Sequence, residues 1–217
     1  MTDKLHCSAV VFDFDGTLAD SMPFLEMIGV QVMMKYYGVP EDDATHRYRS
    51  TTGLPYEHQI ENNFPRNSNN HQAVEEFEQL KIDRIFEQKL FPDTTETLRR
   101  LKELGLDIFV SSSTFQPTII KYFEQRGLVD FFREILGYRP GFEKGKHHFD
   151  HIQAHHNLAL ADVVFVGDSL KDYERSKGIC QFIGIRGIFT EEDFRKAGHT
   201  GHIVDSIGDV PDLLEPI

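Results

Sequence analysis

The chain has 217 residues, of which 40% are hydrophobic and 27% are charged, and its formal net charge is −12. This length fits one large domain, or a core domain with a smaller inserted one, and is enough to bury a sizeable core. The acidic balance disfavours nucleic acid as a partner, because no basic stripe is present to displace counterions. It leaves room for a small phosphorylated metabolite, because a local metal and one or two lysines reverse the field inside a cleft.

The sequence carries no pattern for export or membrane insertion. Residues 1–8 lack a basic stretch followed by an apolar run, and no apolar stretch approaches the roughly 20 residues of a membrane span. Cys7 and Cys180 lie far apart without a C-x-x-C motif, which favours reduced thiols. We therefore expect a cytoplasmic protein without membrane contact, either a monomer or a homodimer.

Short β-branched or aromatic runs alternate with helical patterns along most of the chain. Strands are expected over residues 8–14, 106–111, 162–167, 181–185 and 202–204, with a weaker candidate at 131–136. Helices are expected over residues 94–104, 117–126, 146–157 and 169–177. The alternation predicts an α/β fold with a doubly wound parallel sheet, whose ligands bind beyond the carboxyl ends of the strands.

The interval 19–91 interrupts this alternation. It shows no strand pattern, only helical stretches at 23–37, 44–50, 56–63 and 71–88. The interval is too long for an ordinary loop and has apolar faces of its own. We expect an inserted all-helical domain at 19–91, within a core formed by residues 1–18 and 92–217.

The acidic pair Asp13 and Asp15 follows the first expected strand and precedes Gly16 and Thr17. Alternation along a strand would send both carboxylates to the same side. Two carboxylates about 4 Å apart repel by roughly 4 kcal/mol at an effective dielectric of 20. A divalent cation, a shared proton or a basic side chain must therefore offset this repulsion. An isolated D-x-D pair is usually an exposed turn, but the other polar clusters of this chain favour a site.

Two of these clusters suit a phosphate group. Ser111 and Ser112 begin a hydroxyl-rich turn after the second strand, although most serine-rich turns only cap helices. Lys144 precedes a helix start, where a cation is unfavourable for the helix dipole unless an anion lies nearby. Taken alone, Lys144 is more simply a solvated loop residue.

The last cluster is acidic. A strand ends at Gly167 and Asp168, and Asp172 follows four residues later, on the same face if the segment is helical. Carboxylate oxygens at this spacing suit Mg²⁺. Asp172 alone would more often be a helix N-terminal charge.

In order and spacing, the four clusters resemble the motifs of the haloacid dehalogenase (HAD) superfamily over nearly the whole chain. Residues 13–17 look like its first motif, Ser111 like the second, Lys144 like the third and residues 167–172 like the fourth. The helical insert resembles the cap of the phosphoglycolate phosphatase-like members, and residues 52–55 look like the T-G-x-P turn of that cap. The resemblance implies a Rossmann-like core with a cap that selects the substrate.

The resemblance also implies a mechanism. Asp13 would attack phosphorus and form an aspartyl-phosphate, and Asp15 would serve as general acid and base. Mg²⁺ would be held by Asp13, Asp168, the main-chain oxygen of Asp15, and Asp172 directly or through water. The phosphate-binding residues would be Gly16, Thr17, Ser111, Ser112 and Lys144.

Several alternatives stay open within this resemblance. The third motif reads Lys144-Gly145-Lys146 instead of the common Lys-Pro-x-Pro, so Lys146 is a rival for the phosphate-binding lysine. An acid at Asp15 disfavours a dehalogenase and a phosphonate hydrolase and favours a phosphatase. A phosphosugar mutase of the β-phosphoglucomutase type is the alternative, and a non-catalytic phospho-ligand-binding protein is the next.

Two further groups of residues are candidates for binding. Arg47 and Arg49 in the insert are placed to meet a second anionic group of the substrate, although a solvated cationic face is the plainer interpretation. His147, His151 and His155 share a helix face, within the histidine-rich stretch 147–156. A linear face seldom closes a tetrahedral metal site without a ligand from elsewhere, so a polar helix surface is favoured over a zinc or nickel site.

Overall fold

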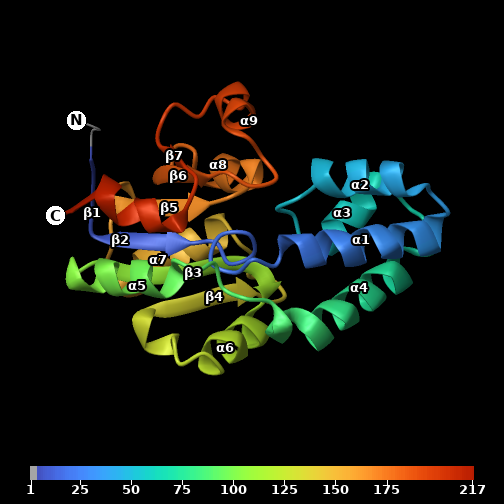
Figure 1. Cartoon of the computed structure of the whole chain (residues 1–217), viewed down its shortest axis with the longest axis horizontal. Coiled ribbons are helices and arrows are strands. Elements are labelled where there is room, and N and C mark those ends of the chain that lie inside the picture. Colours follow the sequence, from blue (N-terminus) through green and yellow to red (C-terminus); the bar gives the residue numbers. More distant parts are fainter. Residues whose placement is uncertain (1–3) are drawn as a thin grey trace. The chain divides into compact units, whose positions relative to one another are not determined.

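The computed structural model describes residues 4–217 and divides the chain into two compact units (Figure 1). The first unit comprises the chain up to Ala19 together with Leu90–Ile217, and the second is Asp20–Lys89. The first three residues of the expected core segment 1–18 lie outside the described residues. Within residues 4–217, no helix has the length and apolar character that a membrane crossing needs.

The first unit is built on a six-stranded sheet in which all neighbouring strands are parallel. In spatial order the strands are β4 (Glu134–Tyr138), β3 (Asp107–Phe115), β2 (Ala9–Phe12), β5 (Val163–Gly167), β6 (Gln181–Ile185) and β7 (Ile203–Val204). Their apolar residues are almost continuous, as strands buried on both faces require. The predicted doubly wound α/β fold is therefore confirmed.

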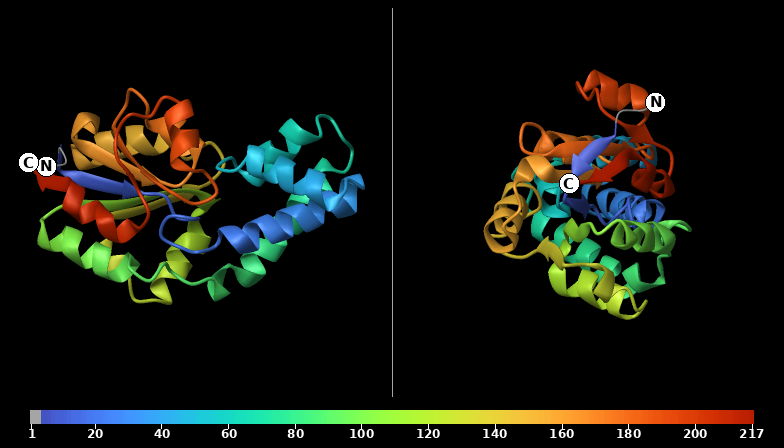
Figure 2. Two further views of the ribbon diagram at one scale, coloured as in Figure 1. Left: turned by 45° about the horizontal axis from the view of Figure 1, so that its top comes forward. Right: turned by 90° about the vertical axis from the view of Figure 1, so that its left-hand side faces the viewer.

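Helices cover both faces of this sheet. The left-hand view of Figure 2 shows α7 (Lys146–His156) and α8 (Leu170–Ser176) above the strands, and α5 (Thr94–Glu103) and α6 (Gln116–Glu124) below them. On the α7 side, Phe149 packs in one buried cluster with Phe109 and Phe165 of the strands. The short helix α9 (Glu191–Lys196) adds Phe194 to the same cluster.

The strand order places a switch point at the centre of the sheet. From β2 the chain proceeds outward through β3 to β4, and from β5 it proceeds outward the other way through β6 to β7. Phe12 at the end of β2 is level with Val110 of β3 and Val166 of β5. The residues that follow these three positions therefore meet at the carboxyl edge of the sheet, where ligands of doubly wound folds bind.

Several short elements were not predicted from the sequence. Strands β1 (Leu5–Cys7) and β8 (Leu214–Pro216) pair with each other in a separate parallel ribbon. The first unit also contains three 3₁₀ segments. Two are single turns, η2 (Val129–Phe131) and η3 (Leu160–Asp162), and the longer one is η4 (Ile207–Leu213). Segments of three to seven residues are too short for a hydrophobic period, so only tertiary pairing defines them.

All the regular secondary structure of the second unit, Asp20–Lys89, is helical. Its elements are α1 (Met22–Tyr37), α2 (Glu41–Ser50), α3 (Tyr56–Asn63), α4 (Asn70–Arg84) and η1 (Ile85–Glu87). Gly29 of α1 allows α2 to pack closely against α1, because a Cβ at Gly29 would lie 2.5 Å from the ring of Tyr48 in α2. The Tyr56 hydroxyl donates to the Gly29 carbonyl at 3.1 Å, and its ring stacks on Phe77 at 3.7 Å.

Two expectations about strand ends were wrong. The strand expected at 8–14 ends at Phe12, and Asp13 and Asp15 lie in the turn that follows, so strand alternation does not orient them. The strand expected at 106–111 continues to Phe115, with an irregular register against β4 between Ser111 and Phe115. The segment from Ser111 to Thr114 is therefore an irregular strand end instead of a turn.

Candidate active site

Asp13 begins the loop that leaves β2 at the switch point. Its backbone N–H donates to the Val166 carbonyl at 2.9 Å, which holds the loop against the neighbouring strand β5. Gly16 turns the chain with a φ of 82°, a conformation that favours glycine, and its N–H donates to the Ala19 carbonyl at 2.9 Å. Asp13 is buried, with 7% of its side chain exposed.

Three carboxylates converge at this point. Oxygen atoms of Asp13, Asp168 and Asp172 lie within 4.8 Å of one another, and all three residues are buried. Asp168 follows the end of β5, and Asp172 lies in the first turn of α8. The structure therefore brings together the acidic residues of the first and fourth sequence clusters.

Local hydrogen bonds fix the position of Asp172. The Ser169 hydroxyl donates to Asp172 Oδ2 at 2.7 Å, and the Asp172 N–H donates back to Ser169 Oγ at 3.2 Å, so Ser169 caps α8. A Cβ at Gly167 would lie 2.7 Å from Asp172 Oδ2. Glycine at the end of β5 is therefore what allows the helix to approach the strand tip so closely.

Lys144 lies inside the carboxylate cluster. Its Nζ is 2.7 Å from Asp13 Oδ1 and 2.6 Å from Asp172 Oδ1, and 3% of its side chain is exposed. Lys146 is 77% exposed and pairs with Asp150 at 2.5 Å. The structure therefore places Lys144, and not its rival Lys146, at the cluster.

The cluster holds more buried negative charge than its cations balance. Burial raises the pKa of Asp13 to about 7; the Lys144 ammonium opposes this shift and the Asp172 carboxylate adds to it. Burial, followed by repulsion from Asp13 and Asp172, raises the pKa of Asp168 well above its usual range. Burial alone would lower the pKa of Lys144, but its two carboxylate partners hold that pKa above its ordinary value.

The residues fit a divalent cation. Besides Lys144, the nearest ion-pair partner of Asp172 is Arg175, whose Nη1 is 3.7 Å from Asp172 Oδ1. Asp172 Oδ1 is fully buried and has ion-pair partners but no hydrogen bond among the described residues. Buried carboxylate oxygens with an excess of negative charge are the donor set that Mg²⁺ prefers.

The remaining polar side chains of the site come from the first loop and from β3. The Thr114 hydroxyl donates to Asp15 Oδ2 at 2.5 Å, an interaction that the sequence did not indicate. Ser111 Oγ lies 2.8 Å from Nδ1 of the buried His148. Ser112 Oγ accepts from the Thr114 N–H at 3.0 Å, and Thr17 Oγ1 is buried without a hydrogen bond among residues 4–217.

The two arginines expected to meet the substrate are paired inside the second unit. Arg49 donates from Nε and Nη2 to the two carboxylate oxygens of Glu26, both at 2.7 Å. Arg47 donates to Asp43 Oδ2 at 2.9 Å and to the Asn63 carbonyl at 3.2 Å. Substrate binding by either arginine stays a prediction, and these partners would have to be exchanged for it.

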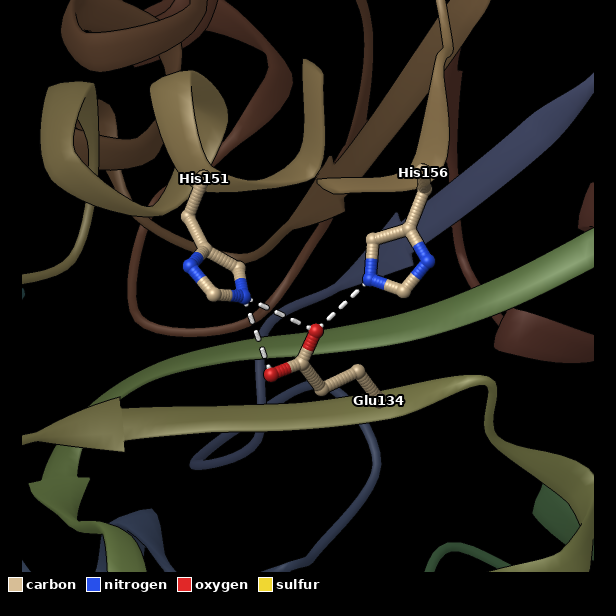
Figure 3. A group of neighbouring side chains, drawn as sticks. All are labelled: Glu134, His151 and His156. Carbon is tan, nitrogen blue, oxygen red and sulfur yellow. Dashed lines mark hydrogen bonds and ion pairs between the residues drawn. The ribbon is translucent and has the colours of Figure 1, made fainter. Parts of the chain in front are cut away.

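The histidine-rich helix forms a different group from the expected one. His147 accepts from the Glu143 N–H at 3.0 Å, and His155 stacks on His151 with ring centroids 4.1 Å apart. Figure 3 shows instead His151 and His156 of α7 converging on Glu134 of β4. The distances are 3.0 Å from His151 Nε2 to both Glu134 oxygens and 2.7 Å from His156 Nε2 to Oε2.

The protonation of His156 argues against a metal in this group. The Arg133 Nε–H donates to His156 Nδ1 at 3.0 Å, so the proton of a neutral His156 lies on Nε2, facing Glu134. A metal at Nε2 would need that nitrogen bare and the proton on Nδ1, against the Arg133 donor. The group in Figure 3 is therefore a hydrogen-bonded carboxylate with two histidine donors.

Comparison with known proteins places the chain in a family. The family model described as haloacid dehalogenase-like hydrolase matches residues 10–184. The chain belongs to this family. A phosphoglycolate phosphatase from Neisseria meningitidis is 26% identical over an alignment of 235 positions, gaps included. The alignment covers 97% of this chain and 95% of the relative.

Solved structures of the family share the fold. A predicted phosphatase from Clostridium acetobutylicum superposes with a TM-score of 0.80 at 21% identity, covering 97% of this chain and 98% of the other. A haloacid dehalogenase-like hydrolase from Streptococcus pneumoniae gives a TM-score of 0.79 at 23% identity, covering 94% and 96%. The predicted family, its phosphoglycolate phosphatase-like branch and the enzyme class of a phosphatase hydrolase are therefore confirmed.

Proposed function

We propose that the protein is a Mg²⁺-dependent phosphatase that hydrolyses a small phosphomonoester through an aspartyl-phosphate on Asp13. The observation that carries this proposal is the position of Lys144, whose Nζ joins Asp13 and Asp172 inside a buried carboxylate cluster. The Lys144 ammonium is fixed beside the buried nucleophile, where it suits the negative charge of an incoming phosphate group. The excess negative charge of the carboxylates suits the metal ion that would bind with that phosphate.

The first half-reaction transfers the phosphoryl group to the protein. An oxygen of the Asp13 carboxylate attacks phosphorus, and the bond from phosphorus to the substrate's ester oxygen breaks. Asp15, in its protonated form, gives its proton to the leaving alkoxide, and the hydrogen bond from Thr114 holds this carboxyl group in place. Lys144 and the Ser111 hydroxyl contact the transferring oxygens and offset their charge.

The second half-reaction returns the protein to its starting state. The Asp15 carboxylate accepts a proton from a water molecule, whose oxygen attacks phosphorus as the bond to Asp13 breaks. The products are an alcohol and inorganic phosphate, and Asp13 is a free carboxylate again. Thr17 in the first loop is buried, which limits the access of other water to the intermediate.

The metal ligands in this proposal are Asp13, Asp168, the main-chain oxygen of Asp15, and Asp172 directly or through water. When bound, Mg²⁺ neutralises charge on the phosphoryl oxygens and on the carboxylates that surround them. The two free cysteines, Cys7 and Cys180, agree with a reducing cytoplasm as the compartment.

The substrate class in this proposal is a small phosphorylated metabolite. The relatives from Neisseria meningitidis and Aliivibrio fischeri are named phosphoglycolate phosphatases, which makes a short phosphorylated acid the first substrate to test. Substrate selection would fall to the second unit, with Arg47 and Arg49 as its candidate residues. A phosphosugar mutase would share Asp13 and Asp15, and the assay below separates it by its product.

The experiment is turnover of a panel of phosphomonoesters with Mg²⁺, comparing the wild type with Asp13→Asn. We expect release of inorganic phosphate that falls by roughly 10⁴-fold or more in the variant, because a nucleophile acting within a catalytic unit is removed. Circular dichroism of both proteins shows whether the variant is folded. Equal turnover of the two proteins would contradict the proposal, and isomerisation of a sugar phosphate without phosphate release would replace it with the mutase.

A further inference from the structure

His148 is the one histidine of α7 that contacts the candidate active site. It lies in the first turn of the helix, is fully buried, and its Nδ1 is 2.8 Å from Ser111 Oγ. Its ring packs on Phe142 with centroids 4.6 Å apart. Its Nε2 is buried and has no hydrogen-bond partner among residues 4–217.

The unpartnered Nε2 discriminates between the two neutral forms of the ring. With the proton on Nε2, a buried N–H donor would be left unsatisfied, which is among the costly features of a protein interior. With the proton on Nδ1, Nε2 carries only a lone pair, and Nδ1–H donates to Ser111 Oγ. The second form leaves no orphaned donor in the buried site.

Burial and the positive charges around the ring keep it neutral. Burial, and after it the Lys144 ammonium, lowers the pKa of His148 to about 3; Arg175 and His147 act in the same direction. The Gly137 backbone opposes this shift of the pKa.

The form of the ring decides what the Ser111 hydroxyl can do. A serine hydroxyl has one proton and two lone pairs. If Nδ1 were bare, it would accept a hydrogen bond from the Ser111 hydroxyl. Ser111 Oγ would then present only its lone pairs to a phosphate oxygen, and these lone pairs would repel that oxygen. If Nδ1–H donates into a lone pair of Oγ, the Ser111 proton stays available for the phosphate.

We propose that His148 is a positioning residue: its Nδ1–H donates to Ser111 Oγ and thereby directs the Ser111 hydroxyl proton to the phosphoryl group. This inference rests on the proposed function for the role of Ser111. It assigns to the chain a polar pair, Ser111 with His148, that only the folded structure brings together, since the two residues are 37 positions apart.

The first test is the protonation state of His148 in the full chain, measured by long-range ¹H–¹⁵N correlation NMR. The signals are assigned by their loss in His148→Asn. We expect Nδ1 at the shift of a protonated nitrogen and Nε2 at that of a bare one. The opposite pattern, or a charged ring at neutral pH, would overturn the proposal; neither result depends on turnover.

The second test is the affinity for inorganic phosphate in the presence of Mg²⁺, measured by calorimetry. His148→Asn keeps an amide donor near the position of Nδ1, and His148→Gln moves it toward the position of Nε2. We expect the Asn variant to bind within about twofold of wild type and the Gln variant to bind roughly three- to tenfold more weakly, the effect of one neutral hydrogen bond.

A double-mutant cycle separates positioning from general damage to the site. In a Ser111→Ala background, the difference between the Asn and Gln variants should disappear, because no hydroxyl is left to direct. An unchanged difference in that background, or equal affinities of the Asn and Gln variants with Ser111 present, would contradict the inference. A wild type that binds phosphate but hydrolyses no ester would instead contradict the proposed function.

Discussion

Two groups of ionisable side chains in the first unit have the composition of a metal site, and they lie at different positions on the same parallel sheet. Asp13, Asp168 and Asp172 meet where the central strands end, whereas Glu134 is the first residue of the edge strand β4 and meets His151 and His156. The first group is buried, and the second is partly exposed, with 30% of the Glu134 side chain accessible.

The two groups differ in whether their charges and hydrogen bonds are satisfied. Glu134 has two histidine donors, and burial, which would raise its pKa, is outweighed by the hydrogen bonds from His156 and His151, so that its pKa is lowered. In the other group, burial and mutual repulsion raise the pKa values of Asp13 and Asp168 despite Lys144. A satisfied group stabilises the fold, whereas a buried group short of positive charge indicates a site that binds something.

The largest effect that tests this contrast is on Lys144. Lys144→Met removes the cation that joins Asp13 and Asp172 and should lower kcat by roughly 10²- to 10³-fold, as loss of one preorganised electrostatic group does. Lys146→Met is the matched control, because that exposed side chain lies outside the site. Equal loss of activity in both variants, measured by phosphate release, would mean that the wrong lysine has been assigned.

The next effect is on the pH dependence of stability without metal. Asp13 has a pKa raised from 3.8 to about 7, so the folded protein binds more protons than the unfolded chain between these values. This contribution to the free energy of unfolding therefore falls as the pH rises from about 4 to about 7, and is constant at higher pH. Asp13→Asn lacks it.

Urea unfolding in EDTA, at about pH 5 and about pH 8, measures this difference. The wild type should lose stability relative to Asp13→Asn by an amount on the order of 1 kcal/mol or more between the two conditions. Saturating Mg²⁺ should reduce the loss, because the bound cation takes over the role of the proton. A pH-independent difference between the two proteins would show that the cluster is not short of positive charge.

The smallest effect belongs to the group in Figure 3. Glu134→Gln weakens the hydrogen bonds from His151 and His156 and should lower the free energy of unfolding at neutral pH by about 1 kcal/mol or less, given the partial exposure. Because the pKa of Glu134 is lowered, this difference is present above its ordinary value of 4.5 and shrinks as the pH falls.

Two readouts decide whether this group is structural. Turnover of the Glu134→Gln variant should stay within about twofold of wild type, because the hydrogen-bond partners of Glu134 are His151 and His156 and not the residues of the acidic cluster. Titration of the wild type with Co²⁺ should give no tetrahedral visible spectrum that depends on Glu134. Such a spectrum, lost in the variant, would contradict the assignment of His156 as a donor to Glu134.

The sequence predicted the parts of this molecule that depend on local patterns. The expected ranges 181–185 and 56–63 coincide with β6 and α3, and the charged residues Asp13, Lys144, Asp168 and Asp172 of three sequence clusters lie together in the structure. The site's charged residues could be named because the order and spacing of their clusters resemble the motifs of the haloacid dehalogenase superfamily, and because carboxyl ends of parallel strands meet at one edge of a sheet. The second unit, Asp20–Lys89, is slightly shorter than the expected insert at 19–91.

The parts that could not be predicted depend on contacts between distant residues. His148 was one histidine among several in a polar-looking helix, and only its distance to Ser111 separates it from His147. The partner of Arg49 is Glu26, 23 residues away, and the partner of Asp15 is Thr114, 99 residues away. No pattern of period or spacing encodes such pairs, because tertiary packing selects them.

The most direct test of the account is to trap the covalent intermediate. Asp15→Asn should still accept the phosphoryl group from p-nitrophenyl phosphate, whose leaving group needs no proton, but should lose the base that activates water. After rapid acid quench, mass spectrometry of the digested variant should find phosphate on the peptide that contains Asp13. A turning-over wild type with no phosphate on Asp13 in the quenched variant, or with phosphate on another residue, would contradict the account.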